Sequence, residues 1–166
     1  GFEVIEAKWL FDVSPSQIEV VVHPQSVIHS MVQFADGSVK AQLGTPDMRL
    51  PIQYAFSYPC RLPLTTERLD FSTLSSLTFE QPDPVRFRNL ALSFEALERR
   101  GNMPCILNAA NEVCVAAFLK ERIGFLQMSD VIEQTMQKVD FITTPSYEDY
   151  VATDAVARRV AEELIG

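Results

Sequence analysis

The strongest constraint on the fold is a change of pattern near the middle of the chain. From residue 59 to residue 84 the chain is rich in Ser and Thr, lacks sustained periodicity and is interrupted by Pro59, Pro63, Pro82 and Pro84. Such composition is typical of an ordered linker that crosses a surface. We therefore predict a domain over 1–58, a linker over 59–84 and a second domain over 85–166.

The part before residue 59 combines helical and strand patterns. Apolar residues at helical spacing over Phe2–Phe11 predict a helix that ends at Ser14-Pro15-Ser16. Asp36-Gly37 separates two apolar runs, which is a strong signal for a β-hairpin. We expect three strands, of which the last two pair as antiparallel neighbours, and then a second helix. The strands are predicted over Ile18–His23, Val27–Phe34 and Val39–Leu43, and the helix over Met48–Tyr58.

Beyond residue 84 helical patterns recur and strand signals disappear. Gly101 and Gly124 follow two of these patterns, in the place where glycine commonly ends a helix. Asn108, Ser146 and Asp154 are residue types that favour the start of a helix or of a helical turn. The helices are predicted over 85–100, 108–122, 129–139 and from Ser146 onward. The predicted fold class is α+β, with a β-hairpin sheet followed by a small C-terminal helical bundle.

Composition excludes several classes of partner. Asp and Glu number 22 against 14 Lys and Arg, the net charge is −8, and no basic stripe is present. Nucleic acid and anionic membranes are therefore poor partners. No apolar run approaches the ~20 residues of a membrane span, so we expect a soluble protein. Three cysteines without paired spacing favour a reducing compartment, and no signal peptide is recognisable.

Spacing alone identifies only weak candidates for chemistry. Glu3 and Glu6 would share one face of a helix and could offer oxygen ligands to a divalent cation, but acidic residues in a first turn also complement the helix dipole. His23 and His29 suit structural roles at strand ends better than metal binding, because no further His or Cys lies nearby, although either could still act in acid–base or positioning work. Met48 stands at a loop-to-helix junction, where core packing is commoner than ligand contact.

Longer strings of residues are more informative than these single positions. The strings lie, in order, at Gly1–Phe11, His23–Val32, Asp36–Ser38, Ala41–Gly44, Pro46–Arg49 and Leu107–Glu112. Together they closely resemble the 1-deoxy-D-xylulose 5-phosphate reductoisomerase family, in that family's order and at its separations. The resemblance extends from Gly1 to the last predicted helix.

The resemblance implies a particular place within a larger enzyme. Members of this family bind NADPH in an N-terminal Rossmann-type domain, hold metal and substrate in a central α/β domain that also dimerises, and end in a helical domain. The chain would begin late in the central domain, so residues 1–58 would be the C-terminal part of a truncated α/β catalytic and dimerisation domain. We expect a bacterial, cytoplasmic homodimer that pairs through the sheet of this domain.

The resemblance also implies roles for single residues. Glu3 corresponds to the last carboxylate of the family's metal triad, which would bind Mg²⁺ or Mn²⁺ and contact the substrate, and Glu6 would support it. His29 would form part of the catalytic pocket wall, and Met48 would contact the substrate, a phosphorylated sugar. The family isomerises 1-deoxy-D-xylulose 5-phosphate and reduces it with NADPH, but we expect this chain alone to be inactive. The alternative is a self-sufficient binding or oligomerisation module.

Overall fold

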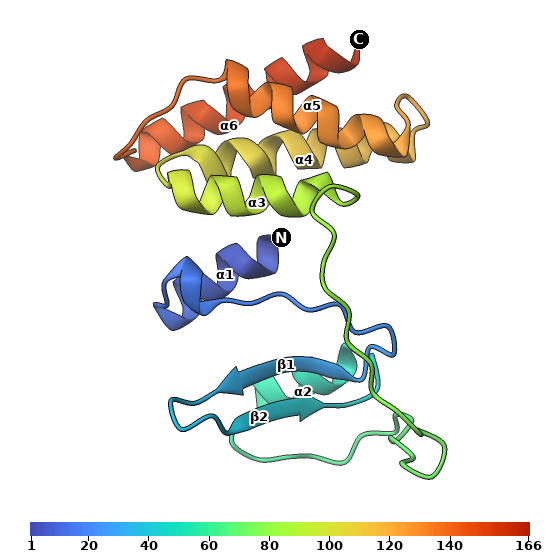
Figure 1. The fold of residues 1–166 in the computed structure, drawn as a ribbon. Helices are drawn as coiled ribbons and strands as arrows, with labels where there is room; N and C mark the ends of the chain where they lie inside the picture. Colours follow the sequence, from blue (N-terminus) through green and yellow to red (C-terminus); the bar gives the residue numbers. More distant parts are fainter. The chain divides into compact units, whose positions relative to one another are not determined.

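The computed structural model describes residues 1–166, and the fold is α+β (Figure 1). Packing divides the chain into two compact units. The helical unit contains Gly1–Val20 and Asp83–Gly166, and the hairpin unit contains Val21–Pro82. The first 20 residues thus pack with the C-terminal helices. The division into domains over 1–58 and 85–166 with a linker over 59–84 stays a prediction about the parent architecture.

The helical unit is built around α4, which packs against α3, α5 and α6. Leu92, Ile106 and Ile132 are almost completely buried at its core. Burial of each such side chain contributes about 1.5–3 kcal/mol relative to exposure. The helices are α1 (Phe2–Phe11), α3 (Arg88–Arg99), α4 (Met103–Leu119), α5 (Phe125–Lys138) and α6 (Tyr147–Ile165), with a short 3₁₀ turn at Pro15–Gln17.

A buried amide joins three parts of the helical unit. The Asn102 side chain is fully buried before α4. Its Nδ2 donates to the Asp140 carbonyl at 3.0 Å and to Thr153 Oγ1 at 3.1 Å, and its Oδ1 accepts from the Ile142 backbone N–H at 2.9 Å. Every hydrogen-bonding group of this amide is satisfied, which offsets the cost of burying it. The start of α4 is therefore fixed to the loop before α6 and to α6 itself.

The hairpin unit contains the predicted antiparallel pair. Strand β1 (Ile28–Gln33) pairs with β2 (Val39–Leu43), and α2 (Arg49–Ser57) follows (Figure 1). Gly37 has a φ of 85°, which a glycine adopts without strain. Asp36 Oδ1 accepts hydrogen bonds from the Ser38 N–H at 2.9 Å and the Ser38 hydroxyl at 2.6 Å. The predicted Asp-Gly turn is confirmed, as is the helix that follows the loop.

The predicted first strand is wrong. Residues 18–23 form no strand, and their one sheet-like contact is an isolated bridge between Val22 and Glu80. A β-strand needs a partner along its length, and the chain supplies one only at Glu80. The β-branched composition of 18–23 therefore produces an extended segment without a ladder.

Several predicted helix boundaries are also wrong, among them the start at residue 129, since α5 begins at Phe125. Helix α4 begins at Met103, and Pro104 is tolerated because it lies in the first turn. Asn108 therefore lies inside the helix instead of capping it. Gly124 precedes α5 instead of ending α4, which stops at Leu119. Helix α6 is continuous, so Asp154 lies within it and caps no turn. The predicted cap at Ser146 is confirmed, since its hydroxyl accepts a hydrogen bond from the Asp149 N–H.

Candidate functional site

His29 lies in an irregularity of the hairpin. Ile28 pairs with Leu43 and Ser30 pairs with Gln42, so His29 is an extra residue in β1, as in a β-bulge. Bulges change the direction of a side chain and are frequent next to active sites. The His29 side chain is exposed and its ring lies over Gly44, where a Cβ atom would be 3.8 Å from Nε2. This geometry presents an imidazole beside the loop that follows β2.

Met48 follows that loop and is flanked by an ion pair. Asp47 Oδ1 accepts from the Arg49 backbone N–H at 2.9 Å, and the Arg49 guanidinium binds both carboxylate oxygens of Asp47. These hydrogen bonds lower the pKa of Asp47 below its usual value and hold the start of α2. Met48 itself is 71% exposed, so its side chain lies outside the core of the hairpin unit. An exposed, flexible thioether between two ordered neighbours is suited to ligand contact.

No sequence pattern marked Ser26, although its backbone is unusual. Ser26 has a φ of 50°, and its N–H donates to the His23 carbonyl at 3.0 Å to close a turn. Positive φ is uncommon outside glycine, and such residues occur preferentially at functional sites. Ser26 lies three residues before His29 in the same unit. The hairpin unit thus brings a strained turn, a bulged histidine and the Gly44–Met48 loop into one short stretch of structure.

His23 has a different environment from His29. Its Nδ1 lies 2.8 Å from the Thr78 carbonyl oxygen, and its ring stacks on Phe79 with 4.9 Å between centroids. Its Nε2 is buried and has no hydrogen-bond partner in the chain. These contacts tie His23 to the segment at 78–79.

Glu3 lies in the first turn of α1, in the helical unit, and its side chain is exposed. Glu6 is also exposed on α1. Nowhere in the chain do three His, Cys, Asp or Glu side chains come together as a metal site. One carboxylate fits a hard divalent cation chemically but supplies only one of the several oxygen ligands that such an ion takes. Further ligands would have to come from other groups.

An open hollow of about 540 Å³ lies between α2 and the segment after it. Gly44 and Leu50 line it, together with Arg61 and Arg68, whereas His29 and Met48 do not. The Arg61 guanidinium lies 4.0 Å from the centre of the Tyr54 ring, a cation–π contact. The sequence did not indicate this hollow, because part of its wall is formed by the aperiodic segment 59–84.

The fold and the candidate residues define an α+β protein with a bulged histidine in a hairpin unit and an acidic helix in a helical unit. Residues 43–160 match the family described as DXP reductoisomerase C-terminal domain, and the chain belongs to this family. None of the six helices is both long and apolar enough to cross a membrane.

Named relatives agree with this assignment. The chain is 74% identical over 165 residues to 1-deoxy-D-xylulose 5-phosphate reductoisomerase of Bacteroides fragilis, and 54% identical to that of Porphyromonas gingivalis. The alignments cover 99% of this chain but only 42% and 43% of those proteins. The chain therefore spans less than half the length of the relatives it matches.

Solved structures show the same relationship. The reductoisomerase of Zymomonas mobilis in complex with NADPH is 46% identical, with a TM-score of 0.89 over 98% of this chain and 43% of the other. A DOX-P reductoisomerase in complex with NADPH, fosmidomycin and magnesium is 37% identical, with a TM-score of 0.88 over 98% of this chain and 42% of the other. The family resemblance and the fold class expected from the sequence are confirmed.

Proposed function

We propose that this chain is the C-terminal part of an enzyme that isomerises 1-deoxy-D-xylulose 5-phosphate and reduces it with NADPH to 2-C-methyl-D-erythritol 4-phosphate. The observation that carries the proposal is 74% identity over nearly the whole chain to a reductoisomerase. Similar solved proteins hold NADPH, magnesium and the inhibitor fosmidomycin. The bulged His29 and the exposed Met48 lie on the hairpin unit, where both side chains are accessible to a ligand.

We assign roles in the parent enzyme to three residues, one in the helical unit and two in the hairpin unit. Glu3 is one ligand of a divalent cation, Mg²⁺ or Mn²⁺, because its exposed carboxylate supplies the anionic oxygen that hard cations prefer. Through that position Glu3 also contacts the substrate. His29 forms part of the pocket wall, where its imidazole can donate or accept one hydrogen bond, and Met48 packs against the substrate. When bound, the metal supplies Lewis-acid stabilisation of substrate oxygens and NADPH supplies hydride.

The proposed assembly is a homodimer in the bacterial cytoplasm. The two-stranded sheet leaves the outer edges of β1 and β2 without strand partners, which is a ready surface for pairing. Cys60, Cys105 and Cys114 are all free thiols, which fits a reducing compartment.

The proposal is tested with the full-length protein that carries this chain. Purified protein with substrate, NADPH and Mg²⁺ should consume NADPH, and removal of the metal by a chelator should stop the reaction. The 166-residue chain assayed alone should consume NADPH no faster than a protein-free control. Full-length protein that leaves NADPH unchanged under these conditions would contradict the proposed activity.

A binding or oligomerisation module is the second candidate. Exposed apolar side chains on the hairpin, including Val32 and Val39, favour it. The same assay separates the two functions, because such a module has no reason to consume NADPH in the presence of substrate.

A further inference from the structure

Residues Thr78–Glu80, here called the strap, lie against the segment that leads into β1. Two backbone hydrogen bonds join Val22 and Glu80, at 2.9 Å and 2.8 Å. The strap belongs to the aperiodic segment 59–84, so no helix or sheet of its own holds it in place. Its position depends on these contacts with a segment that is distant in the sequence.

Two side chains add to the attachment. Gln25 Nε2 donates to Thr78 Oγ1 at 2.7 Å, and the Thr78 N–H donates to Gln25 Oε1 at 3.2 Å. His23 reaches the Thr78 carbonyl through Nδ1 at 2.8 Å and stacks on Phe79. Thr78 is therefore bound through its N–H, its carbonyl and its hydroxyl.

The contact at Thr78 defines which ring nitrogen of His23 carries the proton. A backbone carbonyl can only accept, so Nδ1 must be the donor. Nδ1 of His23 therefore carries a proton in this contact, whereas Nε2 is buried and has no partner in the chain. Only the Nδ1 side of the ring makes a polar contact.

The attachment continues directly into the candidate site. The His23 carbonyl accepts from the Ser26 N–H, which closes the turn in which Ser26 has positive φ. Val27 is 7% exposed, and its carbonyl accepts from the Gly44 N–H at 3.0 Å. The bulged His29 comes two residues later and its ring lies over Gly44. The segment between His23 and His29 is thus fixed by the strap at one end and by Gly44 at the other.

We propose that His23 is a positioning residue, which through its bond to the Thr78 carbonyl fixes the turn before β1 and thereby sets the position of the His29 ring. The consequence for turnover rests on the proposed function, whereas the geometric role does not. The ring of His23 contacts Thr78 and Phe79, so its effect on the Gly44–Met48 loop passes through the backbone.

Two substitutions separate the two ring nitrogens. In His23→Asn the amide NH₂ stands near the place of Nδ1 and can still donate to the Thr78 carbonyl. In His23→Gln the longer side chain moves the amide toward the place of Nε2, so that bond is lost. Because Nε2 has no partner in the chain, Asn loses no polar contact on that side. Both variants remove the stacking on Phe79, so stacking does not distinguish them.

The readout is hydrogen exchange and histidine NMR on the full-length protein. His23→Gln should speed exchange of the Glu80 and Gly44 amides by roughly fivefold, the effect of losing one hydrogen bond, and should shift the His29 ring signals. His23→Asn should keep the exchange rates of these amides and the His29 ring signals near those of the wild type. The spectrum of a His29→Asn variant identifies the His29 signals. Equal behaviour of the Asn and Gln variants, or unchanged His29 signals in His23→Gln, would overturn the proposal.

Kinetics then test the consequence for the reaction. His23→Gln should raise the KM for substrate about fivefold or more relative to His23→Asn, since the pocket wall is displaced. If His23→Gln does not fold, Gln25→Ala releases the strap while leaving His23 in place, and it should shift the same NMR signals. Absence of turnover in the wild type refutes the proposed function and not the geometric role, which the exchange and NMR data decide alone.

Discussion

Glu3 is the one residue of this chain that we propose as a metal ligand. The residue is exposed in the first turn of a helix, where a carboxylate also complements the helix dipole. Helical spacing does not distinguish these two roles, because Glu6 is also exposed on the same helix. Only the longer string around Glu3 favours the metal ligand, so the assignment stays a prediction.

Glu3→Gln in the full-length protein tests this assignment. The change keeps the size of the side chain and removes its charge, so metal affinity should fall and turnover should drop by at least ~10²-fold. Turnover at limiting Mg²⁺ and NADPH binding by fluorescence are the measurements, and NADPH binding should survive. Glu6→Gln is the matched control and should have a much smaller effect. Wild-type turnover of Glu3→Gln at limiting metal would return Glu3 to the helix-dipole role.

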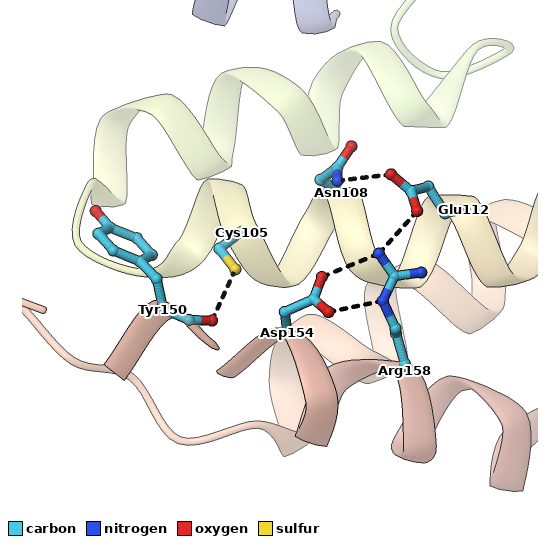
Figure 2. Close-up of polar contacts among 6 residues, drawn as sticks. All are labelled: Cys105, Asn108, Glu112, Tyr150, Asp154 and Arg158. Atoms are coloured by element: carbon cyan, nitrogen blue, oxygen red, sulfur yellow. Dashed lines mark hydrogen bonds and ion pairs between the residues drawn. The ribbon is translucent and has the colours of Figure 1, made fainter. Parts of the chain in front are cut away.

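Helices α4 and α6 are joined by a charged cluster on their surface (Figure 2). The Arg158 guanidinium binds Asp154 through Nε at 2.7 Å and Glu112 through Nη2 at 2.7 Å. Asn108 donates to the other oxygen of Glu112 at 3.1 Å. Hydrogen bonds from Arg158 and Asn108 lower the pKa of Glu112, and the two carboxylates raise the pKa of Arg158. Within the Leu107–Glu112 string, Glu112 therefore binds α6 directly, and Asn108 bonds to Glu112 instead of capping a helix.

The cluster predicts a pH-dependent contribution to stability. The pKa of Glu112 is lower in the folded state, so its stabilisation is complete above the pKa of a free glutamate, about 4.3, and is lost as the pH falls below it. Glu112→Gln should lower the free energy of unfolding by about 0.3–1 kcal/mol at pH 7, a value limited by the partial exposure of both groups. Urea unfolding at pH 7 and pH 3 is the measurement.

Glu98→Gln is the control for this prediction, because Glu98 is exposed on α3 and forms no ion pair. It should change stability little at either pH. A difference between Glu112→Gln and wild type that is as large at pH 3 as at pH 7 would show that the ion pair is not its source.

For the whole molecule, the hairpin unit has surfaces that its own residues do not cover. Val32 is 58% exposed and Val39 54% exposed, and both outer strand edges are unpaired. Exposed apolar residues on an open sheet edge favour association between copies.

The isolated 166-residue chain should therefore self-associate. Its average mass in sedimentation equilibrium should rise with concentration, and Val32→Lys should reduce that rise, because a charge on the strand opposes pairing. Leu119→Lys is the control, since Leu119 is 75% exposed at the end of α4 in the other unit. A monomer mass at every concentration, or an equal effect of both variants, would refute association through the hairpin.

The sequence by itself determined those features whose causes are local. The Asp36-Gly37 turn, the helix over Phe2–Phe11 and the cap at Ser146 depend on backbone preferences and on hydrogen bonds between near neighbours. The family could also be identified from the sequence, because several long strings of residues rarely occur in the same order by chance. From Ser30 to Gln42 the hairpin register follows from the length of the turn.

Tertiary structure alone decided the features that depend on distant partners. Residues 18–23 have strand composition but form no strand, because a ladder needs a neighbour and only Glu80 meets them. The bulge at His29 depends on how two strands pair, and the bond from His23 to Thr78 joins residues 55 positions apart. Such contacts leave no periodic signal along the chain, since their energy arises only when folding brings the two segments together.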